Sequence, residues 1–101
     1  MKVIADISVI PIGVGVSLSK YVAACEKILR ATGLDVTLHA NGTNIEGDWD
    51  TVFEALKRCH ETVHQMGAPR VSTTVRVGTR TDRDQTMTDK LKSVESKLPG
   101  A

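Results

Sequence analysis

Residues 34–47 read LDVTLHANGTNIEG, and this stretch decides the fold. Apolar and polar residues alternate on both sides of Asn41-Gly42, and a period of two is typical of half-buried β-strands. The dipeptide Asn-Gly is favoured in tight hairpin turns. We therefore predict two antiparallel strands, residues 34–41 and residues 43–47, joined by a hairpin in the middle of the chain.

Two further alternating segments, residues 2–10 and residues 70–80, lie on either side of this hairpin. Between each of them and the hairpin the apolar residues follow helical spacing, which predicts one helix over residues 18–32 and another over residues 49–66. We expect the first helix to be capped by Ser17 or Ser19 and the second by Asp48 or Asp50. A short terminal helix is predicted from the spacing of Met87, Leu91, Val94 and Leu98.

The predicted order of elements, βαββαβ followed by a helix, is that of ferredoxin-like domains. Right-handed crossovers give the strand order 4-1-3-2 and place both main helices on one face of the sheet. The chain has 101 residues, of which 41% are hydrophobic, enough for one core and too few for two. We therefore expect an α+β ferredoxin-like sandwich with an additional C-terminal helix, forming a single domain over residues 1–101.

Every second residue of the predicted strands is polar, so one sheet face packs under the helices and the other can hold something polar. The polar positions are Asp6, Ser8, Thr37, His39, Asn41, Asn44, Glu46, Ser72, Thr74 and Arg76. Ile4 and Ile10 stand among these polar residues, and a bare face of this mixed kind is a natural oligomer surface. We expect a homo-oligomer.

Composition excludes several classes of function. A formal net charge of +1 and an aromatic content of 3% argue against a nucleic-acid surface, which needs a basic patch and stacking rings. The first ten residues contain Asp6 and no long apolar run, so we expect no export signal, no membrane contact and a cytoplasmic location. Cys25 and Cys59 fall on apolar helical positions and are predicted to be buried, reduced thiols.

One motif, His60-Glu61-Thr62-Val63-His64, matches the H-E-x-x-H pattern of zinc proteases. At roughly 100° per residue, however, Glu61 points about 150° away from the apolar stripe of its helix, toward solvent. No downstream histidine supplies a third ligand. We interpret the motif as the polar flank of an amphipathic helix, with weak metal binding by His60 and His64 left open, and we predict no metal centre, no cofactor and no catalytic residue.

A second motif, Gly13-Val14-Gly15, lies between the first predicted strand and helix and is similar to the start of a dinucleotide-binding fingerprint. Leu18 stands where the third glycine belongs, so we interpret these glycines as residues that let the loop turn tightly. The start of the following helix, with Ser17 and Ser19, could still bind an anionic group such as phosphate.

Two carboxylates are predicted to meet on the polar face. If the hairpin turns at residues 41–44, His39 lies opposite Glu46, and Asp6 lies near Glu46 on the neighbouring strand. Opposed like charges need compensation by a bound cation, a partner's basic residue or a raised pKa. The two acids could also act as an acid and base pair, or be neutralised by Arg76 or His39.

Several segments together resemble a known family. They are Pro11-Ile12-Gly13, Ser17 to Val22, Gly42 to Asp48, Gly67 to Val71 and Lys92-Ser93-Val94. The chain resembles the small thiamine-binding-protein family of ferredoxin-like oligomers, related to the YkoF type that binds thiamine and its hydroxymethylpyrimidine moiety. The resemblance implies a tetramer built through sheet faces, no catalysis, and a pyrimidine-type ligand held near subunit contacts.

On this basis we expect a cytoplasmic, non-enzymatic binder of thiamine (vitamin B1) or its hydroxymethylpyrimidine precursor, acting as a carrier, buffer or sensor. In this hypothesis Glu46 pairs with the aminopyrimidine and Asp6 offsets the thiazolium charge. Orienting hydrogen bonds come from Ser8, Asn41 and Thr43. Two alternatives stay open: a small enzyme using Asp6, Glu46 and His39, and a structural or regulatory homo-oligomer with no small ligand.

Overall fold

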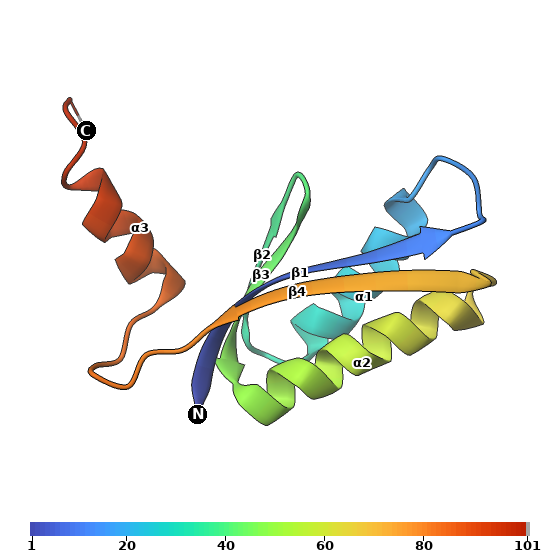
Figure 1. Ribbon diagram of the computed structural model, residues 1–101, viewed down its shortest axis with the longest axis horizontal. Coiled ribbons are helices and arrows are strands. Elements are labelled where there is room, and N and C mark those ends of the chain that lie inside the picture. The colour runs from blue at the N-terminus through green and yellow to red at the C-terminus, as the bar shows by residue number, and fades with distance from the viewer. Residues whose placement is uncertain (101) are drawn as a thin grey trace.

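The computed structural model describes residues 1–100 and has the predicted order of elements (Figure 1). The elements are β1 (Lys2–Ile12), α1 (Ser19–Ala31), β2 (Asp35–His39), β3 (Gly42–Asp48), α2 (Trp49–Gln65), β4 (Arg70–Gly78) and α3 (Met87–Glu95). The strands form one antiparallel sheet in the order β2-β3-β1-β4. The ferredoxin-like fold with an additional C-terminal helix is therefore confirmed, as is the predicted strand order.

The core lies between the sheet and the helices α1 and α2, which cover the same face of the sheet (Figure 1). Alternate residues of β1, from Val3 to Val9, are buried under these helices, as the period of two predicts. The side chains with the least exposed surface are Leu29, Ile45, Val3, Val52, Val63 and Cys59. In the part of the chain that the structure describes, no helix is both long and apolar enough to cross a membrane.

The two cysteines pack together in the contact between α1 and α2. Both thiols are buried and free, with Cys25 Sγ 4.0 Å from the Cys59 carbonyl oxygen and Cys59 Sγ 3.6 Å from the Cys25 carbonyl oxygen. The neighbouring Cys25 thiol and burial raise the pKa of Cys59, so this thiol stays protonated at neutral pH. The predicted burial of both thiols is confirmed.

The hairpin turns two residues earlier than the predicted turn at residues 41–44. The turn is Ala40-Asn41, and Gly42 is already the first residue of β3, paired with His39. Gly42 lies so close to β1 that a Cβ atom there would be 2.7 Å from the Ile7 carbonyl oxygen. Close approach of two backbones, rather than the turn itself, therefore explains this glycine.

The earlier turn changes the pairs across the sheet. Asp6 lies opposite Asn44, while Glu46 lies opposite Ile4 on one side and Asp35 on the other. The predicted pairs of Glu46 with Asp6 and with His39 are therefore wrong. The register of β3 differs from the predicted one by two residues on β1 and by four on β2. An even shift keeps every side chain on its face, so the alternating pattern alone cannot detect it.

Of the two predicted helix caps, one is confirmed and the other is wrong. The Asp48 side chain caps α2 by accepting a hydrogen bond from the backbone nitrogen of Asp50, at 3.2 Å. The N-cap of α1 is Leu18, and among the described residues no side chain caps this helix, so the predicted cap by Ser17 or Ser19 is wrong. Without such a cap, the backbone N–H groups of the first turn are left free to meet another acceptor.

We predict that Gly42→Ala destabilises the fold, because the new methyl group would press on the backbone of β1. The expected loss is roughly 1–3 kcal/mol of unfolding free energy, the usual cost of overpacking. Gly78→Ala is the matched control, since the described structure has no atom within 4 Å of a Cβ placed there. Urea unfolding followed by circular dichroism measures both variants, and equal stability of the two would contradict this explanation of Gly42.

Candidate functional site

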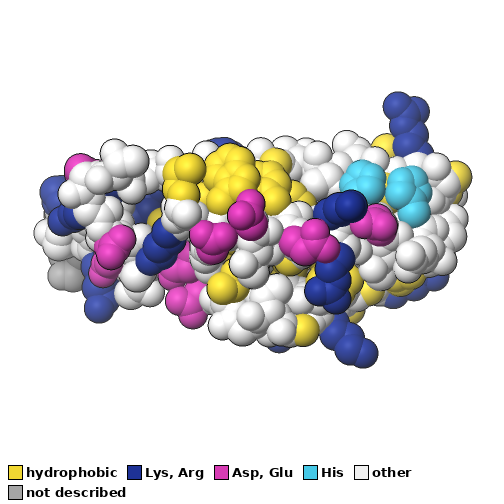
Figure 2. Space-filling model, turned by 90° about the horizontal axis from the view of Figure 1, so that it is seen from below, with side chains coloured by type: hydrophobic (Ala, Val, Ile, Leu, Met, Phe, Trp, Pro, Cys, Tyr) yellow, Lys and Arg dark blue, Asp and Glu magenta, His cyan; other side chains and the backbone are white. Residues whose placement is uncertain are grey.

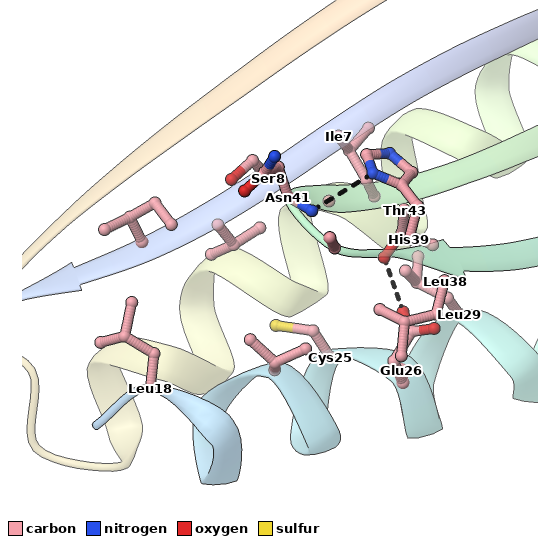
Figure 3. Close-up of a pocket in the computed structure, with 15 residues that line it drawn as sticks. Ile7, Ser8, Leu18, Cys25, Glu26, Leu29, Leu38, His39, Asn41 and Thr43 are labelled. Atoms are coloured by element: carbon pink, nitrogen blue, oxygen red, sulfur yellow. Dashed lines mark hydrogen bonds between the residues drawn. The ribbon is translucent and has the colours of Figure 1, made fainter. Parts of the chain in front are cut away.

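A cavity of about 300 Å³ lies between α1, β1 and the tip of the β2–β3 hairpin (Figure 3). Apolar walls come from Leu18, the N-cap of α1, and from Val22 and Leu29 of the helix, and polar groups come from the hairpin and from α1. The volume is at the lower end of the range of small-molecule sites, which begins at about 300 Å³. The cavity can therefore hold a small, flat molecule with a few polar atoms.

Glu26 is the one acidic side chain on the cavity wall, and it is buried, with 7% of its surface exposed. Its Oε2 accepts a hydrogen bond from Thr43 Oγ1 at 2.9 Å, which Figure 3 marks with a dashed line. Its Oε1 is buried without a hydrogen-bond partner among the described residues. The Arg30 guanidinium lies 3.7 Å from Oε1, beyond hydrogen-bond distance, and the Arg30 side chain is mostly exposed.

A buried carboxylate oxygen without a donor is costly, because folding removes the water that would otherwise hydrogen-bond to it. Exceptions of this kind need a reason, and a ligand that donates to the oxygen is one. Glu26 therefore gives the cavity an unmet capacity to accept a hydrogen bond.

The edge of β1 adds backbone groups to the same cavity. In the described chain, β3 pairs with β1 only as far as Ile7, whereas β4 pairs with β1 as far as Ile12. The stretch from Ser8 onward therefore has no neighbouring strand on the hairpin side, and Ser8, Val9 and Ile10 line the cavity there. Unpaired strand edges present backbone donors and acceptors that can bind the edge of a planar ligand.

His39 closes the hairpin side of the cavity. Its Nδ1 accepts a hydrogen bond from the backbone nitrogen of Asn41 at 3.3 Å, and its Nε2 lies 2.8 Å from Asp6 Oδ1. Because Nδ1 accepts, Nε2 carries the proton and donates it to Asp6. The Asp6 carboxylate thus fixes the imidazole ring at the mouth of the cavity.

The five residues predicted to bind a ligand do not all meet. Ser8, Asn41 and Thr43 line the cavity, while Asp6 lies behind His39 on the open sheet face. Glu46 does not line it: its Oε2 accepts a hydrogen bond from the Met87 backbone nitrogen at 3.2 Å and lies 3.7 Å from Lys2 Nζ. The structure therefore brings three of the five together and gives Glu46 a different neighbourhood.

Sequence reasoning missed Glu26, although a signal was present. On α1, Glu26 lies four residues after Val22 and three before Leu29, which places it on the apolar stripe. A charged residue at a stripe position is rarely buried unless it is paired or functional. That irregularity is the feature that could have identified it.

The H-E-x-x-H segment forms no metal site in the described residues. His60 Nδ1 lies 2.6 Å from Thr73 Oγ1, His64 Nδ1 lies 2.9 Å from the Ala68 carbonyl oxygen, and Glu61 is exposed as predicted. The two rings lie 5.3 Å apart, and Figure 2 shows neighbouring histidines on one face of the molecule. Within residues 1–100, no group of three or more His, Cys, Asp or Glu side chains is placed to hold a metal ion.

We predict that Thr43→Val destabilises the protein by about 1–3 kcal/mol, since it removes the donor that satisfies Glu26 and leaves the carboxylate unsatisfied. The double variant Thr43→Val with Glu26→Met should be more stable than Thr43→Val alone, because it removes both partners together. Denaturant unfolding of the parent, both single variants and the double variant gives the coupling. Additive effects would show that the two side chains do not depend on each other.

Similar proteins have been named without a defined activity. UPF0045 protein sll0230 of Synechocystis is 62% identical over 98 residues, which cover 97% of this chain and 81% of that protein. UPF0045 protein ECM15 of Eremothecium gossypii is 42% identical over 99 residues, which cover 97% of this chain and 94% of that protein. These names are uninformative about chemistry.

Solved structures share the fold. The crystal structure of hypothetical protein MJ1052 from Methanocaldococcus jannaschii matches with a TM-score of 0.88 and 37% identity, over 93% of this chain and 96% of that one. A Thermotoga maritima protein, provisionally named for thiamine biosynthesis or salvage, matches with a TM-score of 0.80 over 93% of this chain and 99% of that one. Its identity of 17% means that this likeness shows the fold alone.

The family is clear from the sequence. Residues 5–95 match the thiamine-binding protein family, a span that runs from β1 through α3 and includes Glu26, the hairpin and the whole cavity. Since the match covers nearly all of the chain, this protein belongs to the thiamine-binding protein family.

Proposed function

We propose that this protein binds thiamine or its hydroxymethylpyrimidine precursor in the cytoplasm, without catalysing a reaction, and serves as a carrier, buffer or sensor. Family membership supports the ligand class. The observation that carries the proposal is the buried Glu26, which lines a cavity of about 300 Å³ and whose Oε1 has no hydrogen-bond partner in the described chain.

The chemistry of an aminopyrimidine suits this carboxylate. The ring carries an exocyclic amino group next to a ring nitrogen that can be protonated, so one edge of the molecule presents hydrogen-bond donors. A charged acceptor strengthens such bonds, and Thr43 already fixes the orientation of the carboxylate through Oε2. We therefore assign the pyrimidine to Glu26, with Leu18, Val22 and Leu29 packing against its faces.

The remaining polar residues suit the rest of the ligand. Ser8 and Asn41 line the cavity and can orient the pyrimidine or its hydroxymethyl group. Asp6 lies beyond His39, with 38% of its side chain exposed, where its negative charge would favour a thiazolium at the mouth. Glu46, the acid that sequence reasoning assigned to the pyrimidine, has no place in this arrangement.

We predict that the parent protein binds thiamine or hydroxymethylpyrimidine in calorimetric titration and that Glu26→Gln weakens binding about 10- to 100-fold, the effect of losing a hydrogen bond to a charged group. Glu46→Gln is the matched control: it removes the same charge from the open face and should leave the affinity unchanged. Absence of binding by the parent to both compounds would refute the proposed function. If Glu46→Gln lowers the affinity and Glu26→Gln does not, the ligand binds on the open face of the sheet instead.

We also propose that the protein assembles into a homo-oligomer, a tetramer by family resemblance, through the open face of the sheet. The residues of this face on β4 are exposed, and Ile10 on β1 has 37% of its surface exposed. Ile4→Glu should therefore give smaller species in size-exclusion chromatography with light scattering, because it places a charge on the face. Lys57→Glu, on an exposed position of α2, serves as the control, and an unchanged mass of Ile4→Glu would place the interface elsewhere.

A further inference from the structure

Two thiols meet where α1 packs on α2, and one of them borders the cavity. Cys25 lines the cavity and has 7% of its surface exposed, whereas Cys59 has 0% exposed and is not among the described residues that line it. Figure 3 shows the Cys25 sulfur atom on the side of α1 that faces β1. A small reagent dissolved in the cavity would therefore meet Cys25 first.

The two cysteines face each other closely enough for a bond between their sulfur atoms. Cys25 Sγ lies 4.0 Å from the Cys59 carbonyl oxygen, Cys59 Sγ lies 3.6 Å from the Cys25 carbonyl oxygen, and the two thiols also hydrogen-bond with each other. Packed helices lie about 8–10 Å apart, and their Cα atoms lie about 2.3 Å from each axis, so directly facing residues have Cα atoms about 3.5–5.5 Å apart. This range overlaps the roughly 4.4–6.8 Å that a disulfide spans.

The hydrogen bond between the thiols gives them different roles. The Cys59 thiol lowers the pKa of Cys25, although burial and the Glu26 carboxylate act in the opposite direction. The same contact, together with burial, raises the pKa of Cys59. Since a thiolate attacks an oxidant and a thiol does not, Cys25 is the more reactive member of the pair.

We propose that Cys25 and Cys59 form an oxidation-sensitive pair that a peroxide reaches through the cavity, with Cys25 attacking first and Cys59 closing the disulfide. The Cys25 thiolate attacks one oxygen of hydrogen peroxide, the O–O bond breaks, and the second oxygen leaves as hydroxide and becomes water, so that Cys25 is oxidised to a sulfenic acid. The Cys59 sulfur then attacks the Cys25 sulfur, and the hydroxyl group leaves as water with the Cys59 proton. One peroxide is reduced to two waters while two thiols are oxidised to one disulfide.

Access through the cavity makes the reaction depend on what the cavity holds. Val22 lies three residues before Cys25 on the same face of α1 and also lines the cavity, so a ligand packed on Val22 covers the route to the Cys25 sulfur. We therefore expect a bound ligand to protect the pair from oxidation. This protection rests on the proposed function, whereas disulfide formation in the empty protein does not.

Timed oxidation of the reduced, ligand-free protein tests the pair and its order of reaction. After treatment with hydrogen peroxide and denaturation in N-ethylmaleimide, intact mass spectrometry should find a monomer that has lost two hydrogen atoms and carries no maleimide. In Cys59→Ser, dimedone should trap Cys25 as the sulfenic acid. In Cys25→Ser, Cys59 should react at least several-fold more slowly, and equal rates in the two variants would refute the assigned order. Dimedone trapping at Cys25 of the parent gives the same information if either variant does not fold.

A variant that narrows the cavity tests the route without any ligand. Val22→Phe places a ring next to Cys25 and should slow disulfide formation at least several-fold. Ala23→Phe, on the exposed side of α1, is the matched control and should leave the rate unchanged. An equal rate in the two variants would show that peroxide enters by opening of the fold and not through the cavity.

The remaining outcomes separate this proposal from the proposed function. No disulfide in the parent, or a disulfide between two chains, would overturn the pair itself. Thiamine that binds in calorimetric titration without slowing the oxidation would overturn protection by the ligand and leave the proposed function intact. If neither thiamine nor hydroxymethylpyrimidine binds, the proposed function and the protection both fail, and a disulfide formed in that protein would still support the pair.

Discussion

The close approach of the β2–β3 hairpin to β1 is the constraint on which the sheet and the cavity both depend. With Gly42 against the Ile7 carbonyl oxygen, the turn is limited to Ala40-Asn41 and the register of β3 on β1 is fixed. Because β3 begins at Gly42, its pairing with β1 reaches only Ile7, and from Ser8 onward β1 has no neighbouring strand on that side in the described chain. The space beside this unpaired part of β1 is covered by α1 and forms the cavity. The absence of a side chain at Gly42 thus leaves an unpaired edge of β1, whose backbone groups a ligand can bind.

The fold was predictable because its determinants are periodic, and the site was not because it depends on register. The alternation in β1 and the helical stripes of α1 and α2 require only which side chains share a face, and these were predicted correctly. The pairing of Asp6 with Glu46 depended on the register of β3 on β1, and a two-residue error in that register preserves every face. Thr43 shows a further limit. Thr43 and Ser8 both line the cavity, as grouped, but the Thr43 side chain lies on the helix face of the sheet and donates to Glu26, a contact that the sequence did not predict.

The two buried glutamates differ in what satisfies them. Each carboxylate has a cation 3.7 Å away, Lys2 for Glu46 and Arg30 for Glu26. Glu46 also accepts a hydrogen bond from the backbone nitrogen of Met87 at the start of α3, where the helix dipole favours negative charge. Glu26 has Thr43 for one oxygen and no donor for the other in the described chain. Burial without a partner costs stability, so selection for folding alone would favour an apolar residue at this stripe position. The proposed ligand would supply the missing donor.

The two glutamates also lie on opposite faces of the sheet. Glu26 lies on the helix side of the sheet, at the cavity, whereas Glu46 lies on the open face, at the start of the segment that carries α3. The proposed ligand site and the proposed oligomer surface thus lie on opposite faces of the same four strands, with β1 contributing to both. Because Asp6 joins the open face to the cavity through His39, a second copy lying on that face would sit next to the mouth of the site. A pocket formed by one chain can in this way be influenced by its neighbour without either chain rearranging its core.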